Sequence, residues 1–438
     1  MLQKKILLMQ SVSHNVQFFN MTISDIRNRS IVLLAIAASG LLFAETVVPS
    51  AILIYFSDIL LVSVLLESRS WNPYSFLVMH WRTFFLYAML IISTVIVSIS
   101  LSISTEISVV IPSLLLISSI LTAIALFAYP IPSLRPPPGQ YKGIGTLSFT
   151  MAIDNPKNGF ESPFNSVRTV QCWFPIKNSI IFLPYSILWT SGNPHTEFDE
   201  SRILLDAVAA NSGLPPFLLR HLSLAKCHSR WQQTFDNIIR LPSDPKMRRF
   251  PIAIYSHGMY GWRQIHHSLC EALASYGFVV FSIDHHPDSM ACRSAKSKDS
   301  PDFYHETFNY ELPSMPGLEE ERLFYQGGLD RRLNDLTTLI NFIESGEIYK
   351  TFPELPRDSL DAGNIYAWGH SYGGCTVSAL SCKDSRVRAV ASLDGWLFPL
   401  PDDLRRVGSL RAPLLNLSAD GWKYGKVSKF INFYFYIR

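Results

Sequence analysis

The stretch Gly369-His370-Ser371-Tyr372-Gly373-Gly374 decides the fold. It stands between an apolar run, Asn364 to Trp368, typical of a buried strand, and a helix-forming run, Cys375 to Cys382. A G-x-S-x-G motif in this setting is typical of a tight strand-to-helix turn, because small residues two before and two after the serine let the chain bend. Such a turn lifts the serine oxygen above the sheet. We therefore predict that Ser371 is a nucleophile in an α/β fold.

A strand-helix-strand unit precedes this motif. Phe250 to Tyr255 and Gly277 to Ile283 are short apolar runs, and Gln264 to Tyr276 between them has helical spacing. This order predicts a parallel sheet. Four further elements are expected: an antiparallel edge strand (Val167 to Phe174), a helix (Leu329 to Ser345, with a shorter one before Gly327-Gly328), and strands at Arg386 to Leu393 and Ala412 to Leu417.

Two backbone amides are candidates for an oxyanion hole. The amide of Tyr372 follows the serine at a helix N-terminus, where partial positive charge favours an anion. The second donor is expected from the loop after the earlier strand, Ser256 to Gly261, with the amide of Met259 as the candidate. The alternative for this loop is an ordinary glycine turn.

Asp394 ends the strand that follows the nucleophile, which is where this fold places the acid that orients a catalytic histidine. The order serine then aspartate is correct. However, His370 is the last histidine of the sequence, so none follows Asp394. Four histidines lie near the motifs, and none is expected to reach Ser371 from the usual side: His257, His285, His286 and His370.

These motifs resemble the platelet-activating-factor acetylhydrolase family of the plasma and intracellular type II kind. The resemblance covers about Pro136 to Trp422 and depends on four blocks: Tyr255 to Met259, Ala274 to Phe278, Gly369 to Val377 and Leu393 to Leu400. It implies an α/β-hydrolase fold and a serine-dependent, calcium-independent phospholipase A2 activity, with no cofactor and no metal. It places the nucleophile on Ser371, the acid on Asp394 and the oxyanion amides on Met259 and Tyr372.

The family's histidine has no position in this sequence, so we expect the chain as written to have little activity. The sequence also departs from the family pattern after Tyr424. We interpret residues 426–438 as an aberrant tail and expect a hydrolase domain at 141–425 that lacks its C-terminal end. The family binds membranes or lipoproteins through an apolar helix ahead of the core; Leu214 to Leu219, beside Ile203 to Ala210, is the candidate here, and an ordinary packed helix is equally compatible.

The segment before the hydrolase domain is markedly apolar. We predict a cytosolic tail at 1–30, about four membrane-spanning helices within 31–129 and a Pro-rich linker at 130–140. The spans expected are a hairpin from Ile31 to Leu66, then Phe84 to Ile103 and Ile107 to Tyr129. Basic residues of the tail, the loop 67–83 and the exit favour a cytosolic hydrolase domain in a multi-pass membrane protein. Reading residues 31–66 as one span would place that domain outside.

Composition excludes some classes of protein. Net charge is +3 and no block of basic residues is interleaved with aromatics, so nucleic acid is not an expected partner. The six cysteines have neither a C-x-x-C pair nor regular spacing, which indicates neither a zinc site nor a disulfide framework. The expected partners are a membrane and a phospholipid or other ester. A broad small-ester hydrolase and a non-catalytic pseudo-hydrolase that binds lipid or a protein remain open, and the oligomeric state is not indicated.

Overall fold

The computed structural model describes more than half of the chain. The described residues are 30–36, 82–83, 86–92, 105–129, 134, 136–153, 167–177, 185–187, 197–231, 234–235, 237–239, 249–286, 288–295, 303–307, 318–404 and 411–418. The chain divides into two compact units, one of residues 1–135 and 209–225 and the other of residues 136–208 and 226–438. Each unit is considered by itself.

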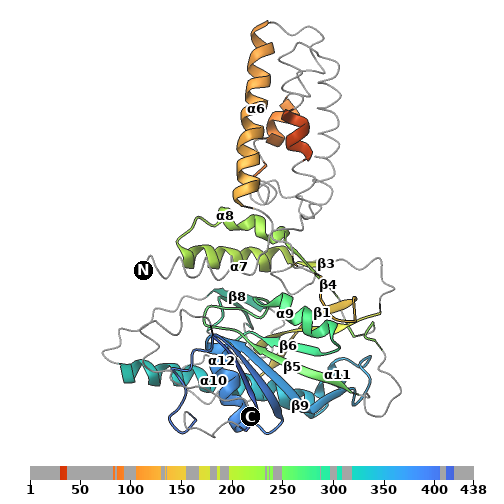
Figure 1. Ribbon diagram of the computed structural model, residues 1–438, viewed down its shortest axis with the longest axis vertical. Helices are drawn as coiled ribbons and strands as arrows, with labels where there is room; N and C mark the ends of the chain where they lie inside the picture. The colour runs from red at the N-terminus through yellow and green to blue at the C-terminus, as the bar shows by residue number, and fades with distance from the viewer. Residues whose placement is uncertain are drawn as a thin grey trace. The chain divides into compact units, whose positions relative to one another are not determined.

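The second unit contains a mixed sheet of nine strands in the order β11-β10-β9-β5-β6-β2-β1-β4-β3 (Figure 1). The strands are β1 (Ile144–Ala152), β2 (Val167–Pro175), β3 (Tyr185–Ile187), β4 (Lys226–Trp231), β5 (Phe250–Ser256), β6 (Val279–Ile283), β9 (Leu360–His370), β10 (Val387–Leu393) and β11 (Leu414–Leu417). Strands β6, β5, β9, β10 and β11 are parallel to their neighbours in this run. Strands β7 (Ala291–Ala295) and β8 (Phe303–Thr307) form a separate antiparallel pair.

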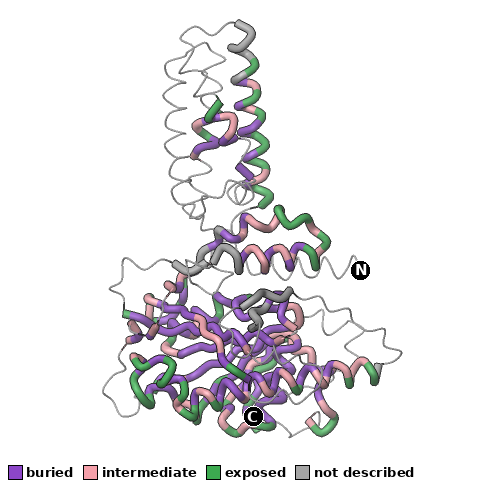
Figure 2. The backbone as a smooth tube through the Cα atoms, turned by 180° about the vertical axis from the view of Figure 1, so that it is seen from behind, coloured by how far each residue is buried: buried purple, intermediate pink, exposed green. Residues whose placement is uncertain are grey.

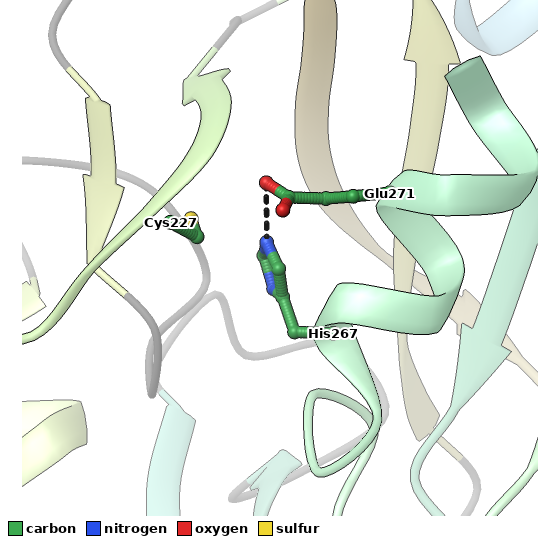
Figure 3. Close-up of side chains that lie close together, drawn as sticks. All are labelled: Cys227, His267 and Glu271. Atoms are coloured by element: carbon green, nitrogen blue, oxygen red, sulfur yellow. Dashed lines mark hydrogen bonds and ion pairs between the residues drawn. The ribbon is translucent and has the colours of Figure 1, made fainter. Parts of the chain in front are cut away.

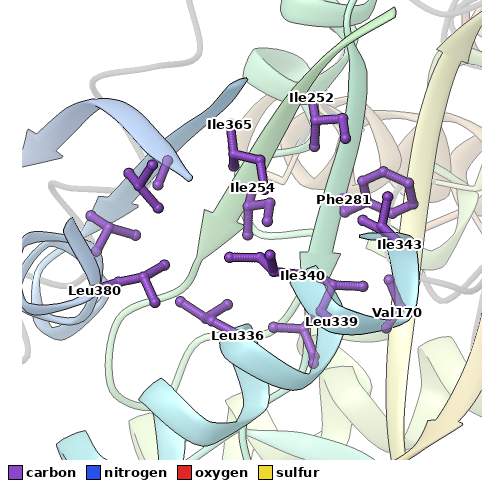
Figure 4. Close-up of a cluster of buried hydrophobic side chains, with 14 of the residues drawn as sticks. Val170, Ile252, Ile254, Phe281, Leu336, Leu339, Ile340, Ile343, Ile365 and Leu380 are labelled. Carbon is purple, nitrogen blue, oxygen red and sulfur yellow. The ribbon is translucent and has the colours of Figure 1, made fainter. Parts of the chain in front are cut away.

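Helices cover both faces of this sheet. They include α9 (His267–Ser275), α10 (Leu318–Glu344), α11 (Glu347–Thr351) and α12 (Tyr372–Lys383). The apolar side chains of α10 and α12 pack on one face, against alternate strand residues such as Ile252 and Ile254 (Figure 4). The intervening residues, Ala253 and Tyr255, join a second cluster with α9 on the opposite face. A mostly parallel sheet with helices on both faces fits the α/β-hydrolase fold expected from the sequence.

Much of the buried tube in Figure 2 belongs to the central strands of this unit, and helix α12 is buried from Tyr372 to Cys382. Ile252, Ile254, Phe281 and Ile365 have no exposed surface. Each buried side chain of this size stabilises the fold by about 1.5–3 kcal/mol relative to its exposed state. The carboxyl ends of β5, β9 and β10 are therefore held rigidly, and the candidate catalytic residues follow these ends.

Most elements expected from the sequence are confirmed, including the strand-helix-strand unit, whose two strands pair in parallel from Ile252 with Val279 to Ser256 with Ile283. Two expectations are wrong. Strand β2 is antiparallel as expected but lies inside the sheet, between β1 and β6. Helix α10 continues through Gly327-Gly328 without a break. A Cβ at Gly328 would lie 2.6 Å from the Tyr372 hydroxyl, so this glycine serves a close approach and does not end a helix.

The first unit includes helix α6 (Thr105–Ala128), which covers most of the last expected span. Residues 30–36 and 86–92 are also helical, and their buried side chains form an apolar cluster with Leu115 and Leu126. Among the described residues, no helix combines the length and apolar character needed to cross a membrane. The prediction of four spans gains no support, and most of residues 31–103, like the tail 426–438, lies outside the described residues.

Two elements of the candidate lipid-binding segment are also defined. Helix α7 spans Glu197–Ser212 and is followed by α8 (Phe217–Arg220) and a 3₁₀ turn at His221–Leu224. The Phe217 side chain is 45% exposed, which leaves an aromatic ring in contact with solvent on the short helix. The role of this segment in lipid binding stays a prediction.

Candidate active site

Ser371 lies in a strained turn between β9 and α12. Its backbone has φ 55° and ψ −119°, a conformation that non-glycine residues adopt only where the surrounding structure imposes it. The Ser371 amide donates to the Leu393 carbonyl at 2.9 Å, and its carbonyl accepts from the Trp396 amide at 2.8 Å. These two bonds tie the turn to the end of β10. The side chain of Ser371 is partly exposed, as access by a substrate requires.

The glycines of the motif allow this turn to form. A Cβ at Gly373 would lie 1.9 Å from the Ser256 carbonyl oxygen, and one at Gly369 would lie 2.3 Å from the Gly373 carbonyl oxygen. Both contacts are with backbone, which cannot rotate away. The motif therefore contains glycine at these positions because the neighbouring strand and the helix leave no space for a side chain.

The loop after β5 approaches the candidate nucleophile closely. A Cβ at Gly258 would lie 3.2 Å from the Ser371 Cβ, so only a residue without a side chain fits there comfortably. The Gly258 carbonyl accepts hydrogen bonds from the Gly261 amide at 3.1 Å, from His257 Nδ1 at 2.7 Å and from the Arg332 guanidinium at 3.5 Å. Because a trans peptide unit is planar, fixing this carbonyl also fixes the direction of the Met259 N–H.

Tyr372 begins α12, and its amide follows the nucleophile in the chain. Its side chain is buried, with the hydroxyl donating to the Tyr325 carbonyl and the Arg332 guanidinium 4.4 Å from the ring centroid. The predicted oxyanion donors Met259 and Tyr372 therefore belong to two segments that Arg332 contacts together. Their catalytic role stays a prediction.

Asp394 follows the carboxyl end of β10 at φ 48°, and its amide donates to the Leu417 carbonyl at 2.7 Å. Because Leu393 pairs with His370 in the sheet, Asp394 and Ser371 follow paired residues on adjacent strands. Burial lowers the pKa of His370, while the charge of Asp394 raises it to a smaller extent. The sequence therefore placed these two residues correctly on neighbouring strand ends.

Comparison with known proteins agrees with this geometry. Residues 232–432 match the model of the family described as platelet-activating factor acetylhydrolase, isoform II. These residues, just under half of the chain, resemble that family. The chain is 28% identical over 192 residues to the platelet-activating factor acetylhydrolase of Gallus gallus. The aligned segment covers 40% of this chain and 45% of that protein. The enzyme of the same name from Cavia porcellus is 31% identical over 169 residues, covering 36% and 37%.

The matched segments span less than half the length of these curated relatives. Among solved structures, a ferulic acid esterase from Streptomyces cinnamoneus covers 66% of this chain and 67% of its own, with 20% identity and a TM-score of 0.44. The likeness to the family therefore depends on the sequence match, whose bounds include Ser371, Asp394, Met259 and Tyr372.

The histidines near Ser371 contact other groups. His257 Nε2 lies 2.9 Å from the Ser289 hydroxyl, and His285 Nε2 lies 2.9 Å from the Ser256 hydroxyl. The His370 ring faces the His266 ring at 5.1 Å between centroids. Within the described residues, the Ser371 hydroxyl makes no hydrogen bond, and the expectation that none of these histidines serves as its base stays a prediction.

A second set of serine, histidine and aspartate was not foreseen from the sequence. His285 Nδ1 lies 2.9 Å from Asp335, whose other oxygen accepts from Arg168 at 3.0 Å, while Ser256 contacts the opposite ring nitrogen of His285. Burial raises the pKa of Asp335 to about 6, against the opposing charges of Arg168 and Arg332. Ser256 and His285 have no exposed surface, so no substrate reaches them. We interpret the set as a brace for the end of β5.

Arg332 is the other residue that sequence reasoning missed. Its Nε donates to Asp288 at 2.7 Å and its Nη1 donates to the His257 carbonyl at 2.5 Å, although its side chain is 1% exposed. The guanidinium therefore links helix α10 to the loop after β5. The sequence shows Arg332 only as a charged residue on a helix expected to be largely buried. Its role could not be predicted, because its partners Asp288 and His257 are more than 40 residues away in the chain.

Proposed function

We propose that this chain is a carboxylic-ester hydrolase that cleaves short or oxidised sn-2 acyl groups of phospholipids through an acyl-enzyme at Ser371. The observation that carries the proposal is the strained turn at Ser371 with the Gly258 loop held against it. The names of the relatives, platelet-activating factor acetylhydrolases, support the substrate class. The fragment of those relatives that the chain matches supports no finer choice of acyl length or head group.

In the proposed reaction, the Ser371 oxygen attacks the ester carbonyl carbon and gives its proton to a base. The carbonyl oxygen gains negative charge, which the amides of Met259 and Tyr372 stabilise. Collapse of the intermediate expels the lysophospholipid alcohol, which takes up the proton. Water then attacks the acyl-enzyme, releasing the carboxylic acid and the free serine.

The base is the missing part. In the family, a histidine oriented by the residue corresponding to Asp394 takes the proton, and no histidine follows Asp394 in this sequence. Removing the base from such a triad lowers the rate by several powers of ten. We therefore propose that the chain as given turns over slowly, with the oxyanion amides and the positioned serine supplying what activity remains.

The sequence leaves two other functions open. A broad small-ester hydrolase would use the same turn but prefer water-soluble short-chain esters. A pseudo-hydrolase that binds lipid or a protein without catalysis is favoured by the Ser371 hydroxyl, which has no hydrogen-bond partner among the described residues.

We also propose that residues 31–129 attach the protein to a membrane as a multi-pass anchor, with the hydrolase unit on the cytosolic side. Sequence hydropathy and the distribution of basic residues are the support for this proposal. It is tested by extraction of membranes with alkaline carbonate, followed by protease treatment of sealed vesicles.

The test of the function is labelling of the expressed full chain with a fluorophosphonate ester, which reacts with activated serines without needing the true substrate. Ser371→Ala is the variant, and Ser392→Ala, which removes a buried serine beside the turn, is the control. Slow labelling of the wild type and of Ser392→Ala is expected, because the turn positions the serine but no base activates it, and no labelling of Ser371→Ala is expected.

Hydrolysis of an acetylated phospholipid and of a water-soluble short-chain ester is then compared on the same preparations. A preference for the phospholipid supports the proposed substrate class, whereas a preference for the soluble ester favours the broad hydrolase. A folded wild-type chain that neither labels nor hydrolyses either ester would overturn the enzymatic proposal in favour of the pseudo-hydrolase.

A further inference from the structure

Three buried side chains of the hydrolase unit converge on one point away from Ser371. Cys227 comes from β4, and His267 and Glu271 come from successive turns of α9 (Figure 3). The Cys227 sulfur, one His267 nitrogen and one Glu271 oxygen all lie within 4.8 Å of one another. The side chains of His267 and Glu271 are 2% and 1% exposed, and Cys227 is 3% exposed. A thiol, an imidazole and a carboxylate are therefore gathered where water does not reach.

Several groups compete for a single ring nitrogen of His267. Nε2 lies 3.1 Å from Glu271 Oε1, 3.0 Å from the Ser229 hydroxyl and 3.3 Å from the Trp173 indole nitrogen, which donates to it. One ring nitrogen carries either one proton or one lone pair. If Nε2 carries a proton, that proton faces the N–H of Trp173, and two donors meet. If Nε2 carries a lone pair, the lone pair faces the negative carboxylate of Glu271, and only a cation between them would relieve the repulsion.

The electrostatics of the cluster call for a positive charge. Glu271 Oε1 lies 3.1 Å from His267 Nε2, and the Cys227 sulfur lies within 4.8 Å of both, so two acidic groups face this ring nitrogen. A second proton on the ring is one way to supply that charge. However, His267 Nδ1 is buried and makes no hydrogen bond within the part of the chain that the structure describes, so an imidazolium would bury a charged N–H without an acceptor.

Glu271 provides an independent observation. Its Oε1 accepts from the Ser229 amide and contacts His267, while Oε2 is buried and has no hydrogen-bond partner among the described residues. A buried carboxylate oxygen without a partner costs several kcal/mol unless a cation or donor satisfies it. Figure 3 shows this carboxylate directed toward the histidine from the same helix.

A cysteine nucleophile activated by histidine does not account for the arrangement. A triad uses both ring nitrogens, one toward the nucleophile and the other toward the acid. Here Glu271 contacts Nε2, the nitrogen that the Ser229 hydroxyl also contacts, and Nδ1 has no partner among the described residues. The groups surround a point and do not form a relay.

We propose that Cys227, His267 and Glu271 bind a zinc ion that fastens helix α9 to strand β4. Thiolate, imidazole and carboxylate are all ligands of structural zinc, at about 2.0–2.3 Å from the ion. Tetrahedral ligands at these distances are separated by roughly 3.5 Å, so only a small contraction of the cluster completes the site. The donor set excludes calcium and magnesium, which take oxygen ligands.

Ser229 supplies the fourth position. Its hydroxyl lies 3.0 Å from His267 Nε2 and 3.3 Å from the Cys227 sulfur, so this oxygen adjoins two of the three ligands. A hydroxyl or a water molecule that replaces it completes four-coordination. The site is structural, because every ligand is buried and Ser371 is not among the groups that contact it.

The position of the cluster indicates which elements the ion would hold together. Strand β4 pairs with β1 and β3 toward one edge of the sheet, while α9 follows the loop after β5 directly in the chain. A metal bond between β4 and α9 ties that edge to the element that ends the loop. The inference stands independently of catalysis at Ser371.

The experiment measures metal in the full chain purified without chelators and again after exposure to zinc alone and removal of the excess. Inductively coupled plasma mass spectrometry is expected to find stoichiometric zinc in the wild type. Cys227→Ala and Glu271→Gln should lose it, whereas Cys172→Ala, which removes another fully buried thiol, should retain it. Absence of zinc from the wild type under both conditions, or its retention in both ligand variants, would overturn the proposal.

A second measurement uses only the wild type, so it does not depend on whether the variants fold. Cobalt(II) replaces zinc in sites of this kind, and a thiolate ligand then gives a sulfur-to-cobalt charge-transfer band in the near ultraviolet. A band that zinc abolishes is expected. Cobalt binding without that band would place the metal away from Cys227 and would also overturn the proposal.

Discussion

The turn at Ser371 and the cluster around His267 belong to the same compact unit, but different kinds of interaction stabilise them. The turn consists of six consecutive residues and requires positions without a side chain. A Cβ at Gly369, Gly373 or Gly374 would clash with backbone or side-chain atoms nearby. The cluster joins segments 40 residues apart and depends on side chains that are present. Sterics therefore fix the first site, whereas electrostatics fix the second.

This difference predicts different responses to mutation. A turn built by sterics tolerates no added atom and is insensitive to pH, whereas a buried polar cluster tolerates changes in shape but responds to the loss of one charge. The Ser256-His285-Asp335 set is of the second kind, since every member is buried and hydrogen-bonded. The following experiments test that division.

The largest effect is expected for Gly373→Ala. The added Cβ would lie 1.9 Å from the Ser256 carbonyl oxygen, so strand β5 or helix α12 must shift. The free energy of unfolding should fall by about 3 kcal/mol or more. Thermal unfolding of the purified chain, followed by tryptophan fluorescence, measures this loss.

Gly363→Ala in β9 is the matched control. The nearest atom to its Cβ, an Asp361 carboxylate oxygen, lies at an ordinary contact distance of 3.9 Å, so a change within about 0.5 kcal/mol is expected. Equal stability of the two variants would contradict the account of the turn as a sterically closed structure.

A loss of about 3–5 kcal/mol is expected for Asp335→Ala. The variant leaves the Arg168 guanidinium, whose side chain is 2% exposed, without its carboxylate at 3.0 Å, and it removes the partner of His285. Chemical denaturation of the full chain gives the change in free energy. Asp335→Asn, which keeps the shape, should lose less than the alanine variant.

Glu347→Ala is the control for this prediction. Glu347 pairs with Lys350 at 2.5 Å, but the two side chains are 49% and 71% exposed, so removal of this carboxylate should change stability by at most about 0.5 kcal/mol. Similar losses in Asp335→Ala and Glu347→Ala would show that the buried set does not brace the end of β5.

The sequence predicted the contiguous site far better than the dispersed ones. Ser371, its strand and its helix were recognisable because the turn requires glycine at fixed spacing, and Asp394 followed from the order of strands. The brace was not foreseen, because Ser256, His285 and Asp335 come from three separate elements and only the sheet order brings them together. His267 and Glu271, four residues apart on an expected helix, were a partial signal for a metal site that the irregular cysteine spacing concealed.

The errors in the fold have a similar origin. β2 reads as an edge strand because its alternating pattern does not reveal that β1 and β4 continue the sheet beyond it. Gly327-Gly328 reads as the end of a helix because glycine lowers helix propensity, while the contact between Gly328 and Tyr372 is long-range. In both cases the deciding neighbour is distant in the sequence.

Acidification should lower stability between pH 6.5 and 5. Burial, then the charge of Arg332, lowers the pKa of His257 and of His285 well below the usual value near 6.5. Both are neutral in the folded chain, so the unfolded chain binds more protons below pH 6.5, and stability that is complete above this pH is lost as the pH falls. Asp335, with its pKa raised to about 6, opposes this trend because the folded chain gains a proton there.

Burial lowers the pKa of His266, to about 3, and of His370 as well, whereas the pKa of His267 is raised to about 10. Four histidines with a lowered pKa outweigh the two groups of opposite effect, so the midpoint of thermal unfolding should decrease from pH 7 to pH 5. Besides Asp335, the charged groups acting on His285 are Arg332, Asp288 and Arg168. His285→Gln removes one titrating group and should flatten the profile, whatever its effect on stability at pH 7. An unchanged slope in this variant would assign the pH dependence to other groups.

The smallest expected effects, of opposite sign, are those of two adjacent glycines in α10. A Cβ at Gly327 meets only the Arg331 guanidinium at 4.0 Å, so Gly327→Ala should raise stability by about 0.5–1 kcal/mol through helix propensity alone. A Cβ at Gly328 would lie 2.6 Å from the Tyr372 hydroxyl, which is fixed by its bond to the Tyr325 carbonyl. Gly328→Ala should therefore lower stability by about 1 kcal/mol or more, the penalty of the contact exceeding the gain in propensity.

The two positions lie on the same helix and receive the same substitution. The difference between their changes in stability therefore measures the effect of the close approach of α10 to Tyr372. Gly328→Ala should also displace Tyr372, whose amide is a proposed oxyanion donor, and so slow fluorophosphonate labelling relative to Gly327→Ala. If both variants gained stability equally, Tyr372 would have to move freely, and the turn at Ser371 would then be held only by its own glycines and the bonds to β10.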